Sequence, residues 1–457
     1  MKRHELSTPQ QALLRNSKPI KLLASPKRDF LAETLFIFML CMVLFGLNIV
    51  AARKEALSTG EGDVFRQLVY GGIFVGLLLT SDSLKAAGRI HIPPSYVILP
   101  LAYCLTSAAW AIEPGATIRR LGLTALIIWS VFEAVRRVGF LRAVSVTEGV
   151  LSLAVFLSYA VVLLLPQEGI HQVADAADPG IVGSWRGILV QKNFAGAVCA
   201  VLILFLLFDI SKKSTLWRWL VVLGSAYFLY RTNSKTSLGL LVGALLGGLA
   251  FSRYRVAYNS VALLGLAAVC LGALLTLSIY WDELTGILET KEAFTGRAQI
   301  WSVLLAYAQD NLLFGAGYGS FWNIGAQSPV FHYISSNSWI SKIASGHNGY
   351  LDLLVQLGLP GLLLVVVSLI VVPIKAVLIE ASLKPRERGL LFALLVFCVG
   401  HNFTESSLLD RDMMVEVFFM LSLAFLHAAK REHKDRFIRR LDDARSLFQS
   451  QSCGESP

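Results

Sequence analysis

Charged residues are scarce in this chain of 457 residues. Asp, Glu, Lys and Arg make up 16% of it, whereas apolar residues make up 55%. A soluble globular protein carries about 25% charged residues. Apolar runs of about 18 residues or more, the length that a helix needs to cross a bilayer, recur between Phe30 and Ala429. Because lipid offers no partner to backbone polar groups, such runs must be helical. The composition excludes a soluble globular protein and predicts an all-α polytopic membrane protein.

The chain also lacks the common motifs of metal and nucleophile chemistry, since it contains neither G-x-S-x-G nor H-E-x-x-H. Asp175 and Asp178 stand three residues apart in A-D-A-A-D-P, which is a weak signal for a metal site. The cysteines show no metal-ligand or disulfide spacing. They are Cys41, Cys104, Cys199, Cys270, Cys398 and Cys453. We therefore expect no metal and no cofactor.

Apolar runs along the chain predict about twelve transmembrane helices. Their approximate bounds are 30–50, 64–80, 95–111, 118–135, 148–165, 188–208, 217–231, 237–251, 258–280, 348–374, 389–402 and 412–429. The net charge of +10 does not indicate a nucleic-acid partner, because most Lys and Arg residues stand in loops and tails, where they set the orientation of the spans.

Basic loops alternate along the chain and predict its orientation. With the N-terminus inside, the short loops that face the cytoplasm all carry Lys or Arg, as the positive-inside rule requires. These loops are 81–94, 136–147, 209–216, 252–257 and 375–388. We expect both termini, the basic tails 1–29 and 430–457, to be cytoplasmic, with an amphipathic helix from Lys430 to Arg445 on the inner leaflet. The membrane region 30–280 and 348–429, with its loop, would form a single domain.

The long polar segment 281–347 is then expected on the periplasmic side, as one large loop carrying short helices. It contains G-R-A-Q-I-W from Gly296 and F-G-A-G-Y-G-S-F from Phe314, and it ends in S-G-H-N-G-Y from Ser345. No strand and no P-loop lysine accompany the spaced glycines, so a tight turn is favoured over a nucleotide site. Its aromatic residues could anchor the loop at the membrane interface or form a platform for sugar rings, and both alternatives stay open.

Basic residues at the outer ends of the spans depart from the positive-inside rule. They are Arg119, Arg120, Arg186, Lys192, Arg231, Lys235 and Arg297. Any one of them could snorkel to the interface or form a structural ion pair, but too few acids lie nearby in the sequence to pair them all. As a group they indicate a phosphate or pyrophosphate site, because Arg donates two-pronged hydrogen bonds to phosphate and Lys supplies a point charge.

His347 stands where the tenth predicted span begins. A histidine can take a proton near neutral pH and so suits a general base. Taken alone, it is more simply a residue that caps or hydrogen-bonds the start of a helix. Asn348, Asp352 and Gln356 share one helical face with four-residue spacing.

Another polar group follows the eleventh span, where His401 and Glu405 stand one helical turn apart near Asp410 and Arg411. For this group we favour a structural hydrogen-bond network that joins the last two spans, with Glu405 and Arg411 as possible supporting residues of the site.

With these residues assembled, the chain resembles the O-antigen ligase and polymerase-like superfamily (Wzy- and WaaL-like proteins). Among these it is most similar to the ExoQ-type polymerases of exopolysaccharide repeat units. The motifs that carry the resemblance are G-R-A-Q-I-W, F-G-A-G-Y-G-S-F, G-H-N-G-Y-L-D-L-L-V-Q-L-G-L-P-G-L, Q-K-N-F-A-G, R-T-N-S-K-T-S and N-F-T-E-S-S-L-L-D-R.

The resemblance implies a GT-C-like glycosyltransferase that acts at the periplasmic face without a metal or nucleotide, on a saccharide carried by undecaprenyl pyrophosphate. It implies that His347 is the base and that arginines hold the pyrophosphate. Arg297 and His347 match by motif. The pyrophosphate ligands matched by position are Arg186 and Arg231, with Lys192 and Lys235 in support, and further supporting residues would be Asn348, Arg119, Arg120, Glu405 and Arg411.

We therefore expect a multi-pass enzyme of the bacterial inner membrane that polymerises lipid-linked repeat units into an exopolysaccharide or O-antigen chain. Its partners would be membrane lipids, a chain-length regulator and a flippase. The alternatives are an O-antigen ligase or protein O-oligosaccharyltransferase and, more remotely, a transporter or flippase for an anionic substrate. Transporters usually place charged sites near the midplane of the bilayer, whereas these cations gather at one face.

Overall fold

The computed structural model describes residues 30–46, 64–79, 91–173, 179–210, 215–258, 260, 296–335, 338–411 and 413–452. The regular secondary structure of these ranges is helical, and their β structure is limited to an isolated bridge between Ile170 and Trp185. The predicted all-α class is confirmed for this part of the chain. Asp175, Asp178 and nearly all of the predicted span 258–280 lie outside the described residues, as do both ends of the chain.

The helices follow the predicted apolar runs closely. Their bounds are α2 (Phe30–Phe45), α4 (Val64–Leu79), α5 (Ser95–Thr106), α6 (Pro114–Val138), α7 (Phe140–Leu164), α8 (Pro166–Gly169), α9 (Lys192–Phe208), α10 (Thr215–Arg231), α11 (Lys235–Ser252), α14 (Arg297–Asp310), α15 (Gly349–Val365), α16 (Val372–Ile379), α17 (Pro385–His401) and α18 (Met414–Ser452). A π-helical segment, Val366–Val371, joins α15 to α16, and α15 itself is kinked at Gly358, where the backbone has φ +67°.

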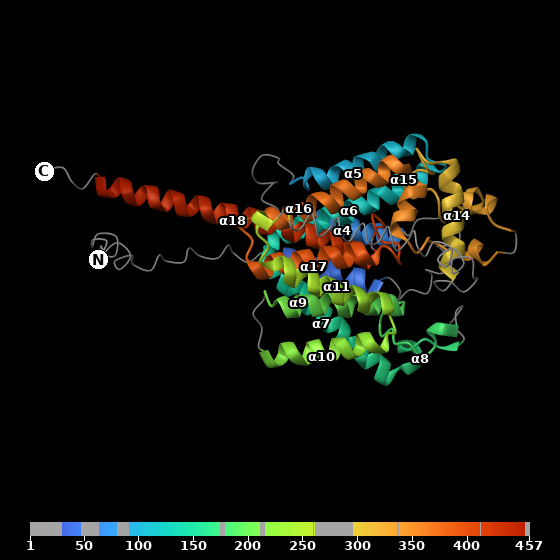
Figure 1. Ribbon diagram of the computed structural model, residues 1–457, viewed down its shortest axis with the longest axis horizontal. Helices are drawn as coiled ribbons and strands as arrows, with labels where there is room; N and C mark the ends of the chain where they lie inside the picture. Colours follow the sequence, from blue (N-terminus) through green and yellow to red (C-terminus); the bar gives the residue numbers. More distant parts are fainter. Residues whose placement is uncertain are drawn as a thin grey trace.

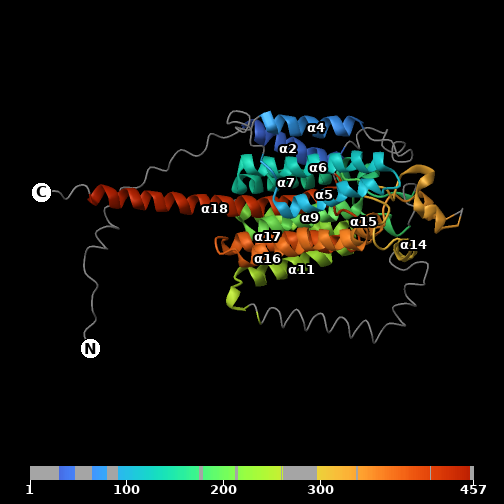
Figure 2. The same ribbon diagram turned by 90° about the horizontal axis from the view of Figure 1, so that it is seen from above.

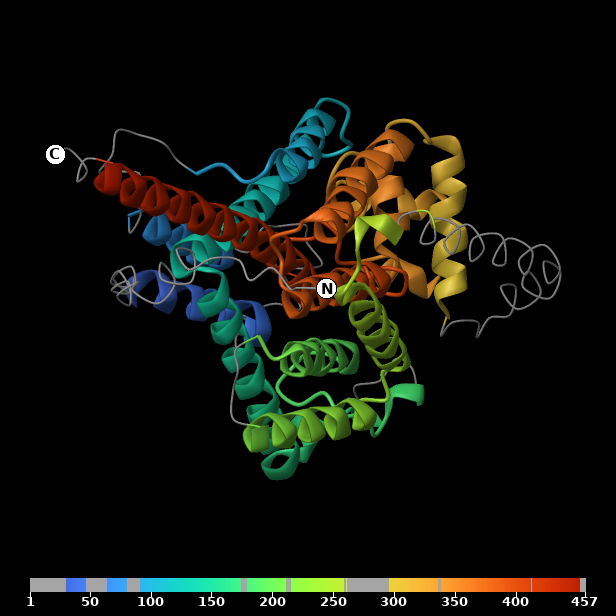
Figure 3. The same cartoon turned by 60° about the vertical axis from the view of Figure 1, so that its left-hand side comes forward.

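The long helices lie side by side in a bundle whose axis is horizontal in Figures 1 and 2. α9, α17 and the first half of α18 form its centre, since their side chains are buried almost all round. Figure 3, an oblique view along the bundle, shows red α18 running diagonally past the teal helices toward the orange helices. At one end α14 lies across the bundle, and at the other end α18 extends beyond it.

Among the described helices, three are long and apolar enough to cross a membrane: Phe140–Leu164, Lys235–Ser252 and Gly349–Ile379. Shorter apolar helices are Phe30–Phe45, Val64–Leu79, Ser95–Ala109 and Lys192–Phe208. The expected count of about twelve spans and the periplasmic position of the polar segment stay predictions.

The polar segment after residue 296 contains helices of its own. After α14 come short 3-10 turns at Gly325–Gln327, Pro329–His332 and Trp339–Lys342. One face of α14 and the chain that follows it enclose a small apolar core separate from that of the bundle. Tyr318, Phe321 and Trp322 are buried, so these rings neither anchor the segment in a membrane interface nor present a platform to sugars. Phe331 and Trp339 are exposed, and either alternative remains open for them.

α18 differs from the expected division into a span and a separate surface helix. Its side chains are buried from Met414 to Ala429, apart from the half-buried His427, and Lys430 and Arg431 are exposed. The helix continues without a break to Ser452. The basic tail residues therefore extend the last helix instead of forming a new one.

Candidate functional site

Glu405 lies at the centre of a polar cluster at the end of the bundle where α14 lies. Its Oε1 accepts hydrogen bonds from Arg297 Nη2 at 2.6 Å and from Asn193 Nδ2 at 2.6 Å. Its Oε2 lies 3.0 Å from His347 Nδ1. These side chains come from the start of α14, the start of α9 and the residue before the cap of α15. The cluster therefore depends on the packing of elements that are distant in sequence.

Helix N-termini also converge on this cluster. Asn193 and Arg297 belong to the first turns of α9 and α14, and His347 precedes the first turn of α15. The start of a helix carries free N–H groups and a positive partial charge. The surroundings therefore favour an anion, which is Glu405 in this structure.

The G-H-N-G motif has a specific geometry around His347. His347 has φ +50°, a left-handed conformation that is uncommon for a residue other than glycine and is found preferentially at functional sites. Asn348 caps α15, because its Oδ1 accepts from the backbone N–H groups of Tyr350 and Leu351 at 3.1 Å each. The predicted capping role therefore belongs to Asn348, and the His347 side chain is directed to Glu405.

Contacts to the loop after α17 fix this motif from the other side. Asn348 N donates to Ser406 Oγ at 3.0 Å, and Gly349 N donates to the carbonyl of Asn402 at 2.8 Å. A Cβ atom at Gly349 would overlap the Asn402 side chain. Only glycine therefore allows the two loops to approach this closely.

Asp352 holds the chain just before His347. This buried carboxylate accepts a hydrogen bond from Gly346 N at 2.9 Å and another from Trp322 Nε1 at 2.7 Å. Gln356, on the same face of α15, accepts from Gly319 N at 2.6 Å. The polar face predicted for this helix therefore binds the segment after α14 and positions His347.

The charge state of Glu405 follows from its neighbours. Burial by itself would raise the pKa of this carboxyl, but the hydrogen bond from His347 and the positive charge of Arg297 outweigh burial and lower the pKa to about 2. Glu405 is therefore ionised at neutral pH. An ionised carboxylate only accepts hydrogen bonds, so Nδ1–H of His347 donates this bond, and in a neutral imidazole Nε2 is then the acceptor. The His347 side chain is 29% exposed, compared with 8% for Glu405, so a substrate can reach this imidazole.

His401 contributes differently from the network that we expected. Its ring is buried and lies 5.8 Å from the ring of Phe397. Neither ring nitrogen has a hydrogen-bond partner among the described residues. The structural network expected here is formed by Asn402, whose Oδ1 accepts from Ser407 N and Leu408 N at 2.9 Å each. The side chains of His401 and Glu405 take no part in it, since Glu405 bonds to Arg297, His347 and Asn193.

Arg120 and Arg411 lie beside the cluster, at a small polar cavity of ≈ 50 Å³. Arg120 donates to the carbonyls of Trp322 and Asn323 at 2.8 Å each, and so binds the segment after α14. Arg411 donates to Asp410 Oδ1 at 3.1 Å. Arg119, the neighbour of Arg120 on α6, is half-buried. Other residues that line the cavity are Tyr318, Ala344, Ser345, Asp352, Gln356 and Ser406.

Arg186 and Arg231 form a second basic corner at the same end of the bundle, near α8 (Figure 1). The Arg231 guanidinium stacks over the ring of Trp185 at 4.5 Å from its centroid, a cation–π contact. Arg186 donates through Nε to the carbonyl of Glu168 at 2.8 Å. Both side chains are half-buried, so these cations already take part in the packing of this corner.

Lys192 and Lys235 are the first residues of α9 and α11. Lys192 is half-buried and stands six residues after Arg186 in the sequence. Its backbone N donates to His171 Nε2 at 3.3 Å. Lys235 is exposed. Sequence reasoning placed both lysines at helix ends but missed Asn193, because a neutral amide carries no charge signal. Across the described ranges, no group of three or more His, Cys, Asp and Glu side chains is arranged to hold a metal ion.

Comparison with known proteins gives a family for part of the chain. Residues 219–366 match the family model described as O-Antigen ligase. The matched region contains Arg231, Lys235, Arg297 and His347 and ends before Glu405. No curated protein matches the chain. Proteins of this family are glycosyl-transferring enzymes. The match supports the resemblance found in the motifs: residues 219–366 are similar to the O-antigen ligase family, which is part of the O-antigen ligase and polymerase-like superfamily.

Proposed function

We propose that this protein is a metal-independent glycosyltransferase that polymerises saccharide repeat units carried on undecaprenyl pyrophosphate, at the periplasmic face of a bacterial inner membrane. The observation that carries the proposal is the contact of Arg297 and His347, both within the family region, with the buried carboxylate of Glu405. This arrangement supplies a proton acceptor and a phosphate-binding cation side by side.

His347 acts as the general base in this proposal. The hydroxyl oxygen of the acceptor sugar attacks the anomeric carbon of the donor and forms the new glycosidic bond, while Nε2 of His347 takes the hydroxyl proton. Glu405 accepts the Nδ1–H hydrogen bond, which orients the ring and stabilises the imidazolium that forms. Glu405 thus has the role of the third group that orients a catalytic base in other enzymes.

Arg297 stabilises the leaving group. As the bond between the anomeric carbon and the phosphate oxygen breaks, the electron pair goes to the lipid pyrophosphate. A guanidinium has five N–H donors, and Arg297 gives Glu405 a hydrogen bond from Nη2, so its other donors can bind phosphate oxygens. Further positive charge would come from the other cations at this end, Arg186, Lys192, Arg231, Lys235 and Arg411.

Within the superfamily, polymerase is our first choice and ligase is the alternative. The ExoQ-like motifs G-H-N-G and N-F-T-E-S-S favour a polymerase, whereas the description of the matching family favours a ligase. In a polymerase the growing chain passes to a fresh lipid-linked unit, and a chain-length regulator and a flippase would act with it. In a ligase the acceptor is another molecule.

Purified protein incubated with the lipid-linked repeat unit alone separates these functions. Longer lipid-linked chains are the expected product of a polymerase. Product that forms only after a second acceptor is added would assign a ligase. Movement of the substrate across a bilayer without a new glycosidic bond would contradict both enzymes and assign a transporter.

A further inference from the structure

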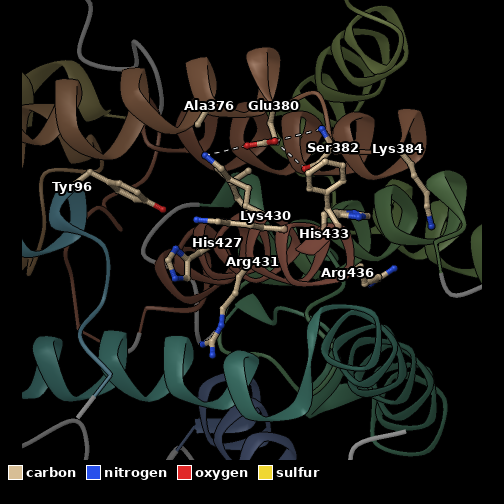
Figure 4. Close-up of a pocket in the computed structure, with 13 residues that line it drawn as sticks. Tyr96, Ala376, Glu380, Ser382, Lys384, His427, Lys430, Arg431, His433 and Arg436 are labelled. Atoms are coloured by element: carbon tan, nitrogen blue, oxygen red, sulfur yellow. Dashed lines mark hydrogen bonds and ion pairs between the residues drawn. The ribbon is translucent and has the colours of Figure 1, made fainter. Parts of the chain in front are cut away.

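A large cavity of ≈ 930 Å³ lies at the end of the bundle opposite to α14, where α16, the loop after it and α18 meet the start of α5. Figure 4 shows its walls, with Glu380 on one side and Lys430 reaching toward it from α18. The cavity is distant from the Glu405 cluster and plays no part in the proposed reaction. The residues that line it are Tyr96, Ala376, Glu380, Ser382, Lys384, Leu426, His427, Lys430, Arg431, His433, Lys434, Arg436 and Phe437.

The charge of this lining is strongly unbalanced. Glu380 is the one carboxylate among the described lining residues, whereas the cations are Lys384, Lys430, Arg431, Lys434 and Arg436. Glu380 pairs with Lys430 at 3.2 Å. The partners of three other cations lie outside the lining: Glu387, 3.7 Å from Lys384, Asp435, 3.9 Å from Arg431, and Glu432, 3.0 Å from Arg436.

These ion pairs do not saturate the cations. The side chains of Lys430, Arg431 and Arg436 are 44%, 49% and 48% exposed, and ion pairs between such exposed side chains contribute little to stability. A phosphate group that accepts several hydrogen bonds can therefore displace these acidic partners at little cost in stability. Lys434, also exposed, has no ion pair with another described residue.

The other part of the lining is apolar. Ala376, Leu426, Phe437 and the ring of Tyr96 contribute it, on the side where the buried part of α18 ends. The basic side chains thus lie next to the edge of the apolar surface of the bundle. An amphiphile with an anionic head would contact both parts, whereas a small soluble anion would use only the cations.

We propose that this cavity binds the phosphate-bearing headgroup of an anionic membrane lipid, with Arg431 and Lys434 on the phosphate and the apolar wall against the lipid backbone. Basic pockets between membrane helices on the cytoplasmic side are suited to such headgroups. The bound lipid would tie α18 to α16 and the loop after it.

The test uses the full-length protein purified in a neutral detergent. Its Tm is followed during titration with phosphatidylglycerol, phosphatidylcholine or inorganic phosphate, and retained lipid is identified by native mass spectrometry. We expect phosphatidylglycerol to raise the Tm and to remain bound. The double variant Arg431→Gln/Lys434→Gln should weaken this binding on the order of tenfold or more, given about 1 kcal/mol for each Lys or Arg.

Two further variants make the test specific. Arg253→Gln/Arg255→Gln removes the same charge from exposed residues that follow α11 and do not line the cavity, and should leave binding unchanged. Glu380→Gln removes the carboxylate of the lining and should tighten binding. Equal weakening in the Arg253/Arg255 variant, or equal effects of the two lipids, would overturn the site. A saturable shift of the same size with inorganic phosphate would overturn the lipid and assign a soluble phosphate.

Discussion

At the scale of single residues, Glu405 explains how an arginine and a histidine can serve one site. The carboxylate binds Arg297 through one oxygen and His347 through the other. The guanidinium is thereby held on one side of the carboxylate, where it can bind phosphate. The imidazole is held on the other side, where its Nε2 can take a proton. Asn193 donates to the oxygen that Arg297 uses and restrains the carboxylate further.

Replacement of His347 by Ala should abolish most of the activity and leave the fold intact. Loss of a general base costs on the order of 10²–10⁴-fold in rate, and a side chain that is 29% exposed contributes little to packing. The rate of polyprenyl pyrophosphate release measures the loss of activity, and the Tm shows whether the fold is intact. His332→Ala, at an exposed histidine of the same segment, is the matched control. A fully active His347→Ala enzyme would remove His347 as the base.

Arg297→Lys should also lose most of the activity although it keeps the positive charge. A lysine presents a point charge, whereas the planar guanidinium can bind Glu405 and phosphate at the same time. We expect kcat to fall more than KM rises, since the charge on the leaving group develops in the transition state. Unchanged kinetics would show that Arg297 serves only to hold Glu405.

The lowered pKa of Glu405 predicts a pH dependence of stability. Its ordinary pKa of 4.5 is the value for the unfolded chain, and in the folded protein the pKa is about 2. Because the folded pKa is the lower one, the stabilisation is fully present above pH 4.5 and is lost as the pH falls toward 2. The difference in Tm between the wild type and Glu405→Gln should therefore be constant from pH 7 to 5 and shrink below pH 4.5. A difference that already shrinks between pH 7 and 5 would contradict an ionised, paired Glu405.

How far the sequence predicts this site depends on the residue. Charged and titratable side chains at helix ends stand out, so Arg297 and His347 could be singled out. Glu405 could only be given a supporting place, because its partners lie 58 and 108 residues away. Asn193, a neutral amide 212 residues from Glu405, leaves no trace in the pattern. Contacts between such distant residues arise from tertiary packing, which periodicity does not encode.

At the scale of elements, the close packing of α11 on α17 depends on small residues. A Cβ atom at Gly248 would lie 2.6 Å from the carbonyl oxygen of Gly389 and 2.9 Å from the Cβ of Ala393. Among the glycines from Gly239 to Gly248, those at the end of the run therefore make the close helix contact. At Gly243, in the same helix, a Cβ would meet nothing within 4 Å.

Gly248→Ala should lower stability by about 1–3 kcal/mol, the usual cost of forcing extra volume into a packed contact. Gly243→Ala is the control and should be neutral or slightly stabilising, because alanine favours a helix over glycine by about 1 kcal/mol. Thermal unfolding of the two purified variants measures the contrast. Equal Tm values for both would contradict the close contact between α11 and α17.

The positions of helices were predictable where long apolar runs determine them, as for α7, α11 and the kinked helical segment from Gly349 to Ile379. The structure of the segment after α14 was not predictable, because it depends on long-range hydrogen bonds such as those of the Arg120 and Gln356 side chains to its backbone. The continuity of α18 was missed for another reason. The change from apolar to basic at Lys430 reflects the end of the surrounding bundle, not the end of the helix.

At the scale of the whole molecule, the two ends of the bundle carry different chemistry. The Glu405 cluster and the second basic corner share the end at α14, and the basic cavity lies at the other end. Alternation of spans and basic loops predicted that the cations proposed for the pyrophosphate share one end. It could not predict that Arg297 and His347 meet there while Arg186 and Arg231 pack in a separate corner.

The most direct measurement is the product of the purified protein given only undecaprenyl-pyrophosphate-linked repeat unit, resolved by mass spectrometry. The proposed polymerase should yield lipid-linked chains that increase by whole repeat units, with one undecaprenyl pyrophosphate released for each bond formed. The wild type and His332→Ala should behave alike, and His347→Ala should yield neither product. Release of the carrier without longer chains, or chain growth that persists in His347→Ala, would contradict the account.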